Sequence, residues 1–224
     1  MKTRKTSTRS ERRKFQKGQK SVFRWSVVIV LLIVGFVGIS FYQSLPQPTA
    51  PLSDERLAQD PSFGFDDARI VIVEYADFGC SACRAWHYSG IIERIIIMYS
   101  EDVKFVWKDF PVITAQSPKA AEAGQCAFDQ GKFWEYHRIV YDNYPSLGVD
   151  KLKEYAEKAG LNMREFNQCL DSGKNRAKIA QSLAEARSYG FPGTPSFLVN
   201  GRPLVGPPSF EMLQAIIEEI LAEG

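Results

Sequence analysis

Apolar and polar positions predict β-structure early and late in the chain, with helices between. Residues 70–75 form a near-continuous apolar run, which is typical of a strand covered on both faces. Residues 83–99 have the apolar spacing of a helix, with a possible kink at Gly90, and residues 103–107 form a second short strand. These segments predict a β-α-β unit.

Helical patterns then continue without a strand until residue 195. Pro118 suits a first helical position, and Asn162 with Glu165 fits an N-terminal capping box. The expected helices cover residues 117–130, 133–144, 150–159, 162–170 and 175–189.

β-structure returns at residues 195–199 and 203–205, which flank Asn200-Gly201, a strong hairpin turn. Ser209 then caps a last amphipathic helix. The expected fold is therefore α/β, with a helical insertion between a β-α-β unit and a β-β-α unit.

The N-terminal segment has a different composition. Residues 1–24 carry ten Lys or Arg and one acid, Glu11, and residues 25–42 carry no charge. Eighteen helical residues span about 27 Å, close to the ~30 Å of a bilayer core, and aromatic residues lie at both ends of this run. We expect a basic cytoplasmic tail (1–24) and a transmembrane anchor (25–42), with the remainder outside the cytoplasm.

A cleaved signal peptide is the alternative for the same residues. It is disfavoured because the apolar run is longer than the usual signal core, and Ser40-Phe41-Tyr42-Gln43 is a poor cleavage site.

Residues 43–61 contain three closely spaced prolines and read as a linker that stays extended. Residues 62–224 then form one domain, with the helical insertion at about 115–189. The net charge of +2 combines +9 in the tail with −7 in the remainder, which has 18 bases and 25 acids. The tail therefore suits membrane topology and anionic lipid, and we expect no nucleic-acid partner.

Cys80-Ser81-Ala82-Cys83 follows the first strand and crosses the start of the first helix. Two thiols at this spacing can close a disulfide, and unpaired N–H groups at a helix start favour a thiolate at Cys80. A thiolate is the attacking species in thiol–disulfide exchange. The motif therefore predicts redox chemistry.

Half of a zinc site is the alternative for this motif. The other candidate ligands are Cys126, Cys169, His87 and His137, and none of them forms a second close-spaced pair. Four cysteines allow three pairings, and adjacency favours 80 with 83 and 126 with 169.

Three segments resemble the DsbA-like branch of the thioredoxin superfamily. They are Tyr75–Cys83 (Tyr-Ala-Asp-Phe-Gly-Cys-Ser-Ala-Cys), Lys108–Pro111 (Lys-Asp-Phe-Pro) and Gly193–Gly201 (Gly-Thr-Pro-Ser-Phe-Leu-Val-Asn-Gly). The resemblance covers roughly residues 65–223. It implies a thioredoxin fold interrupted by a helical domain, and disulfide exchange outside the cytoplasm.

By position, Cys80 resembles the family's nucleophile and Cys83 its resolving thiol. Pro195 resembles the cis-proline that faces the disulfide, and Thr194 the preceding residue that tunes the site. An X–Pro bond is the one place where cis is cheap, at about 0.5–1 kcal/mol. Such a bond would leave backbone groups free to pair with a substrate peptide. An ordinary turn is the alternative.

Glu74 interrupts the apolar strand before the motif. The resemblance implies a buried acid beneath the disulfide, which can accept the proton lost when a thiol ionises, because burial raises a carboxyl pKa. Lys108 is a possible partner for it. A strand end that points to solvent is the alternative for Glu74.

Ser81-Ala82 stands where the best-known family members have Pro-His, so a donor near the thiolate is lost. Known potentials span about −270 to about −120 mV. We expect an intermediate to oxidising value, and a potential below about −250 mV would contradict an oxidase.

Cys126 and Cys169 are expected to form a structural bridge worth about 4 kcal/mol in the chain-entropy description. Two buried free thiols and a regulatory bridge are the alternatives. Phe78, Phe110 and Phe191 are candidates for a substrate groove. His87, two helical turns after Cys80, is a candidate to influence the site, although a surface position is the simpler expectation.

The expected function is oxidation of cysteines in exported proteins by Cys80 and Cys83, without a cofactor, in a monomer that a quinone-linked membrane partner reoxidises. The first alternative is the reverse reaction, in a reductase or an isomerase. The isomerases of this superfamily usually dimerise through an extra domain, for which the short linker leaves no room. The second alternative is a metallochaperone that binds copper or zinc through the same two cysteines.

Overall fold

The computed structural model describes residues 57–223, which contain a five-stranded sheet in the order β1-β3-β2-β4-β5. The central strands β2 and β3 are parallel, and the other neighbours are antiparallel. This arrangement confirms the predicted β-α-β and β-β-α units. The strands are β1 (Ser62–Gly64), β2 (Ile70–Ala76), β3 (Val103–Asp109), β4 (Ser196–Val199) and β5 (Arg202–Val205).

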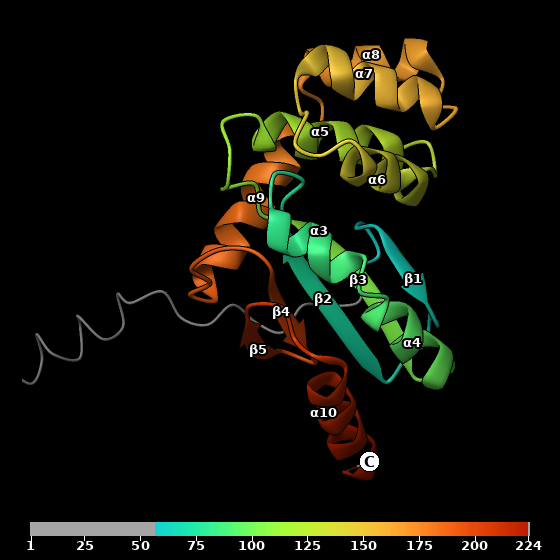
Figure 1. Cartoon of the computed structure of the whole chain (residues 1–224), viewed down its shortest axis with the longest axis vertical. Helices are drawn as coiled ribbons and strands as arrows, with labels where there is room; N and C mark the ends of the chain where they lie inside the picture. Colours follow the sequence, from blue (N-terminus) through green and yellow to red (C-terminus); the bar gives the residue numbers. More distant parts are fainter. Residues whose placement is uncertain (1–56, 224) are drawn as a thin grey trace, which may run out of the picture. The chain divides into compact units, whose positions relative to one another are not determined.

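Helices α5–α8 gather at one end of the sheet, and α9 leads from them back to β4 (Figure 1). They form the predicted insertion. The helices are α3 (Ser81–His87), α4 (Ile91–Met98), α5 (Ser117–Phe128), α6 (Phe133–Asp142), α7 (Val149–Lys158), α8 (Met163–Ser172), α9 (Arg176–Ser188) and α10 (Phe210–Ala222).

The helix predicted over residues 83–99 is in fact two helices. Gly90 has φ of +70°, a left-handed conformation that side-chain-bearing residues rarely adopt, and α4 begins directly after it. The predicted caps are confirmed, since Asn162 Oδ1 accepts from the N–H of Arg164 at 3.1 Å and Ser209 Oγ accepts from that of Met212 at 3.2 Å.

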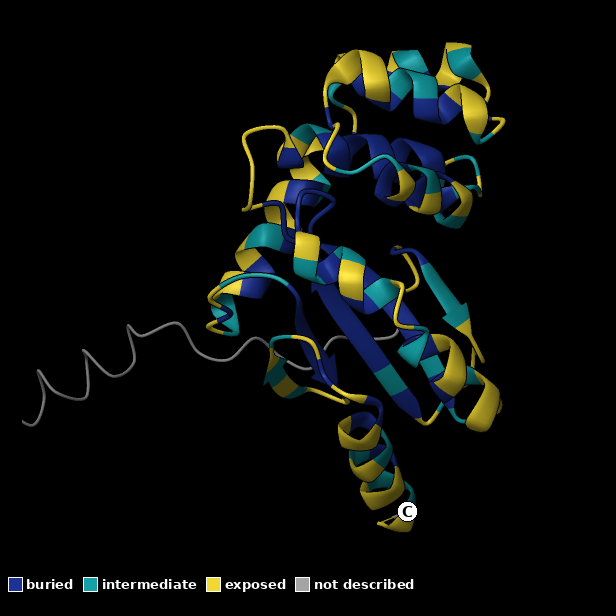
Figure 2. Cartoon of the chain, viewed as in Figure 1, coloured by how far each residue is buried: buried dark blue, intermediate teal, exposed yellow. Residues whose placement is uncertain are grey.

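Strand β2 is almost entirely buried, as Figure 2 shows, and its two faces pack against different layers. Ile70 and Ile72 belong to the cluster that includes residues of α3, α4 and α10, whereas Val73 and Tyr75 pack with residues of α9 and the segment after it. Because side chains alternate along a strand, Glu74 lies on the same face as Ile72.

The predicted tail, the predicted anchor and the first part of the predicted linker lie outside the described residues. Within the part that the structure describes, no helix has the length and apolarity needed to cross a bilayer. Leu57 and Asp60 are buried against the domain, and Pro61 O accepts from the N–H of Trp107 at 2.8 Å. The folded region therefore begins before residue 62, and the short strand β1 is an element that the sequence pattern did not reveal.

Candidate active site

Cys80 is the N-cap residue of α3, as its place before the first helical turn predicted. Its backbone is extended, and Sγ accepts a hydrogen bond from the N–H of Cys83 at 3.3 Å. N–H groups in the first turn of a helix have no acceptor within the helix. The sulfur of Cys80 therefore meets partial positive charge.

The pKa of Cys80 is lowered from 9.0 to about 6. The largest cause is the hydrogen bond from the Cys83 side chain, which outweighs the opposing effect of burial. Thr194 and the backbone of Cys83 and Ala82 lower this pKa further. Cys80 is therefore mainly a thiolate at neutral pH.

Cys83 has the opposite character. It is completely buried, whereas Cys80 keeps 4% of its surface exposed, and both are free thiols. Burial raises the pKa of Cys83, and its hydrogen bond with Cys80 and the charge of Glu74 raise it further. The pair therefore has one ionised sulfur near the surface and one protonated sulfur beneath it.

Asp77 holds the loop that precedes Cys80. Its carboxylate accepts from the N–H of Gly79 at 2.7 Å and from those of Val112 and Ile113, each at 2.8 Å. Its backbone carbonyl accepts from the N–H of Cys80 at 3.0 Å. Asp77 thus ties the loop before α3 to the loop after β3. Sequence reasoning missed this role, although an Asp two residues before a Gly is a turn signal.

The segment before β4 lies against Cys80. The Thr194–Pro195 peptide bond is cis, which confirms the prediction for Pro195, and the Thr194 carbonyl accepts from Cys80 Sγ at 3.4 Å. Thr194 Oγ1 is buried without a hydrogen-bond partner among the described residues. A second cis bond, Tyr144–Pro145, was not predicted.

Glu74 is 1% exposed, which confirms the predicted buried acid and rules out the solvent-facing alternative. Its register partners are Trp107 on β3 and Phe197 on β4. Burial raises the pKa of Glu74 well above its usual value, and the charge of Cys80 adds to this rise. Its Oε1 has no hydrogen-bond partner among the described residues.

The prediction that Lys108 pairs with Glu74 is wrong. Lys108 Nζ lies 3.0 Å from Asp60 Oδ2 and 3.2 Å from Glu185 Oε1. Lys108 is in register with Tyr75, one residue after Glu74, so its side chain lies on the opposite face of the sheet. Glu74 therefore has no cationic partner among the described residues.

The predicted substrate groove is also wrong. Phe78, Phe110 and Phe191 are all at most 5% exposed and belong to the core. The exposed apolar side chains beside the site are instead Val112 and Ile113, whose backbone is held by Asp77. The sequence pattern did not identify them, because a loop pair has no periodicity.

His87 is not the simple surface residue that was expected. It is half-buried, and its ring centroid lies 4.4 Å from that of the buried His137. Within residues 57–223, no group of three or more His, Cys, Asp or Glu side chains is arranged to hold a metal ion.

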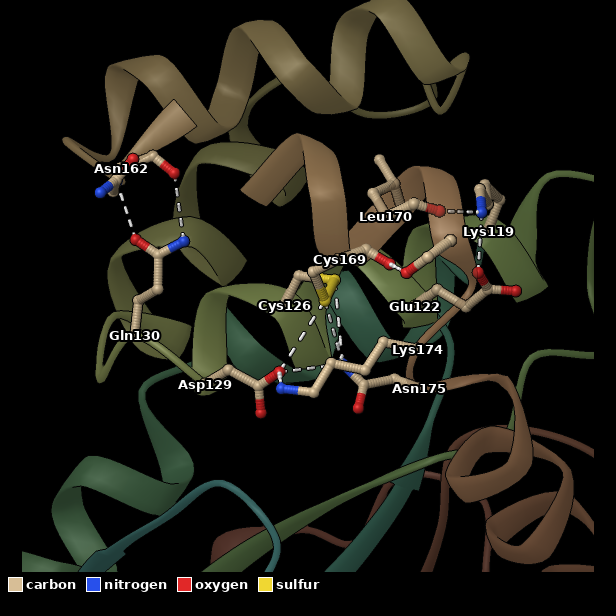
Figure 3. Close-up of a disulfide and its surroundings, with 11 residues drawn as sticks. Lys119, Glu122, Cys126, Asp129, Gln130, Asn162, Cys169, Leu170, Lys174 and Asn175 are labelled. Atoms are coloured by element: carbon tan, nitrogen blue, oxygen red, sulfur yellow. Dashed lines mark hydrogen bonds and ion pairs between the residues drawn. A yellow bond between two sulfur atoms is a disulfide. The ribbon is translucent and has the colours of Figure 1, made fainter. Parts of the chain in front are cut away.

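The predicted bond between Cys126 and Cys169 is confirmed, with Cα atoms 5.9 Å apart. The two residues lie in the last turns of α5 and α8 (Figure 3). Asn175 Nδ2 lies 3.4 Å from Cys169 Sγ, and Asp129 Oδ2 lies 3.8 Å from the same sulfur. Helix C-termini and a carboxylate both disfavour thiolates, so this setting is the reverse of that at Cys80.

Comparisons with known proteins agree with this geometry. The family model described as Thioredoxin matches residues 57–219. The fold is similar to that of a thioredoxin-like oxidoreductase from Silicibacter pomeroyi DSS-3, with 25% identity, a TM-score of 0.65, and coverage of 73% of this chain and 93% of that one. It is also similar to oxidised BdbD from Bacillus subtilis, with 20% identity, a TM-score of 0.69, and coverage of 77% and 97%.

The chain is also similar in sequence to the Na(+)/H(+) antiporter NhaA 3 of Salinispora tropica, with 32% identity over 160 residues. The aligned region covers 70% of this chain but 24% of the antiporter, so the chain spans about a quarter of the length of that relative. Because the family model covers most of the chain and the site has the expected geometry, the chain belongs to the thioredoxin family, and its fold is that of the DsbA-like proteins.

Proposed function

We propose that the chain catalyses thiol–disulfide exchange through Cys80 and Cys83, in the direction that oxidises cysteines of exported proteins. The observation that carries this proposal is the asymmetry of the pair. Cys80 is a stabilised thiolate at a helix start, and Cys83 is a buried protonated thiol beneath it.

The first step is attack by a substrate thiolate on Cys80 Sγ of the oxidised pair. The bond between the two enzyme sulfurs breaks, and Cys83 leaves with the electron pair. Because Cys83 is buried and its pKa is raised, it needs a proton at once. Glu74 is the proposed donor, since burial raises the pKa of its carboxyl group well above the usual value and so favours the protonated form.

In the second step, another substrate thiolate attacks the substrate sulfur of the mixed disulfide. Cys80 leaves as a thiolate, for which its pKa of about 6 makes it a good leaving group. The substrate loses two electrons and gains a disulfide, and the enzyme keeps both electrons as the Cys80 thiolate and the Cys83 thiol. A quinone-linked membrane partner would reoxidise the pair.

Stabilisation of the Cys80 thiolate supports the oxidising direction, because whatever stabilises the reduced pair makes the oxidised pair a stronger oxidant. Thr194 and Pro195 lie beside Cys80, with the Thr194 carbonyl in contact with Cys80 Sγ. This position supports binding of an extended substrate segment there. Val112 and Ile113 would add apolar contact area at the same edge.

The cellular location is part of the proposal. A basic tail over residues 1–24 and an uncharged run over 25–42 support an N-terminal anchor with the domain outside the cytoplasm. N-terminal sequencing of the mature protein and protease treatment of spheroplasts, from which any outer membrane and wall have been removed, test this. A new N-terminus between residues 40 and 55, or a domain protected from protease, contradicts the anchored arrangement.

The exchange function is tested with the oxidised protein and a reduced, unfolded protein that needs disulfides. We expect the wild type to oxidise it and Cys80→Ser to lose this activity. Cys83→Ala should accumulate mixed disulfides at Cys80. Equilibration with glutathione then gives the potential, and a value below about −250 mV excludes the oxidising direction.

A further inference from the structure

The segments around Cys80 contain a single fixed charge, that of Arg84. Three segments meet at the reacting sulfur. Residues 78–88 contain it, residues 110–118 are tied to the loop before it, and residues 189–199 include the carbonyl that accepts from it. The three segments have no other Lys or Arg and no Asp or Glu. Outside the basic tail the chain has 25 acids against 18 bases, so an isolated cation at the site is unusual for this chain.

Arg84 lies one helical turn after Cys80. Its backbone N–H donates to the Cys80 carbonyl at 3.1 Å. Four residues of helix rise about 6 Å, and helical side chains lean towards the N-terminus, so the Arg84 side chain covers the turn that begins at Cys80. An extended substrate segment covers the same length in about two residues.

The guanidinium of Arg84 is held in a fixed orientation. Its Nε donates to the Tyr141 carbonyl, in the last turn of α6, at 2.7 Å. Its Cζ lies 4.9 Å from the ring centroid of Tyr88 and 5.9 Å from that of Tyr144. Arginine and tyrosine are the residue types that contribute most to binding at protein surfaces.

The outer nitrogens of this guanidinium remain free to bind. A guanidinium has five N–H donors, and within residues 57–223 the Nη groups of Arg84 have no acceptor and form no ion pair. Asp142, at the end of α6, accepts from the Tyr88 hydroxyl instead. Arg176 and Arg202, by contrast, pair with acids. A fixed fork of unpaired donors matches the geometry of a carboxylate.

We propose that Arg84 selects substrate segments that carry a carboxylate about two residues from the reacting cysteine. The inference rests on the proposed exchange function and names the substrate class of the same site. The bonds that change are those already described: the substrate thiolate bonds to Cys80 Sγ, and Cys83 leaves with the electron pair and takes a proton. Arg84 holds the segment and takes no part in these bonds.

The test uses the oxidised full-length protein in a nonionic detergent and an excess of reduced peptides with one cysteine. Glu, Gln or Lys stands two residues before or two residues after that cysteine. Acid quench and mass spectrometry give the rate of mixed-disulfide formation. Each rate is divided by the ionised fraction of the peptide thiol, because a neighbouring acid raises the pKa of that thiol.

In one of the two placements, we expect the Glu peptide to react about five- to tenfold faster than the Gln peptide, and the Lys peptide to react more slowly than both. This ratio of Glu to Gln rates should fall in about 0.5 M salt, because salt screens exposed charges.

Three variants locate the preference. Arg84→Gln should bring the ratio below about twofold, and Arg84→Lys should give an intermediate ratio, because it keeps the charge but loses the fork. Arg94→Gln is the matched control. It removes an arginine whose Cζ lies 3.9 Å from the Phe210 ring centroid, on α4, and it should keep the wild-type ratio.

The ratio is decisive because a loss of packing at Tyr141 would slow all peptides alike and leave it unchanged. A wild-type ratio near 1 in both placements, a ratio that survives in Arg84→Gln, or a ratio that salt does not reduce would each overturn the proposal. If the wild type reacts neither with any peptide nor with dithiothreitol, the proposed exchange function fails, and this outcome is distinct from the others.

Discussion

The low pKa of Cys80 depends first on the side chain of Cys83, and this dependence can be tested by two substitutions. Cys83→Ala removes the side-chain donor, whereas Cys83→Ser keeps a hydroxyl in its place. Both variants keep the backbone N–H of residue 83, which lies 3.3 Å from Cys80 Sγ. Each variant also leaves Cys80 as the one free thiol, because Cys126 and Cys169 are bonded to each other.

The size of the effect follows from the two pKa values. A thiol of pKa about 6 is about 90% ionised at pH 7, and one of pKa 9.0 is about 1% ionised. The lower pKa stabilises the reduced pair by about 1.4 kcal/mol at pH 7. This free energy makes the reduction potential of the pair about 30 mV more oxidising. The stabilisation is complete above pH 9 and is lost as the pH falls through about 6, because the folded-state pKa is the lower of the two.

A hydrogen bond to a charged group contributes about 1.5–3 kcal/mol, or about one to two pKa units. We therefore expect the rate of alkylation by iodoacetamide to have its pH midpoint near 6 in Cys83→Ser and between about 7 and 8 in Cys83→Ala. Far-ultraviolet circular dichroism serves as the control for folding. Equal midpoints in the two variants, or a midpoint near 9 in Cys83→Ser, would refute the assignment of the low pKa to this contact.

Three further predictions concern stability. Glu74→Gln should raise the free energy of unfolding at neutral pH by about 1–3 kcal/mol. The gain should vanish towards pH 4.5, because a raised carboxyl pKa destabilises the fold as pH increases. Urea titrations at several pH values measure this. Replacing Cys126 and Cys169 together by Ala should cost about 4 kcal/mol, or about 8–16 °C in calorimetry, while exchange activity persists; an unchanged melting temperature would contradict a structural role. Lys108→Met should cost up to about 3–5 kcal/mol, because it removes a buried cation and leaves Asp60 with Lys178 and Glu185 with the Tyr75 hydroxyl. The alkylation midpoint of Cys80 should stay the same, and a shifted midpoint would mean that Lys108 reaches the redox face after all.

The sequence was sufficient for the parts of the molecule that local patterns encode. The apolar run of β2, the cap at Asn162 and the turn at Asn200-Gly201 each have a signal within a few residues, and all are confirmed. The position of Cys80 at a helix start is likewise a local property of the motif. These features together were enough to place the reacting pair within the fold.

The errors concern contacts between segments that are distant in the sequence. Lys108 was paired with Glu74 because their strands are neighbours, but only the register decides which face each side chain occupies. Phe78 lies two residues before the motif and Phe110 lies in the segment after β3, yet both are buried in the core. The contact of His87 with His137 joins residues on α3 and α6, and no periodicity in either helix could reveal it.

The register of β2 with β3 also explains how the fold tolerates an uncompensated acid. Tyr75 and Lys108 share the face that packs on α9, where Lys108 balances Asp60 and Glu185 and the Tyr75 hydroxyl donates to Glu185. Lys108, the buried cation among residues 57–223, thus lies on the α9 side of the sheet. Glu74, one residue away, faces the other side, where burial and the Cys80 thiolate both keep its proton in place. A lysine on that side would draw the proton away from Glu74 and remove its ability to give one to Cys83. The alternation of side chains along a single strand therefore separates the charges that stabilise the fold from the proton that we propose Glu74 gives to Cys83.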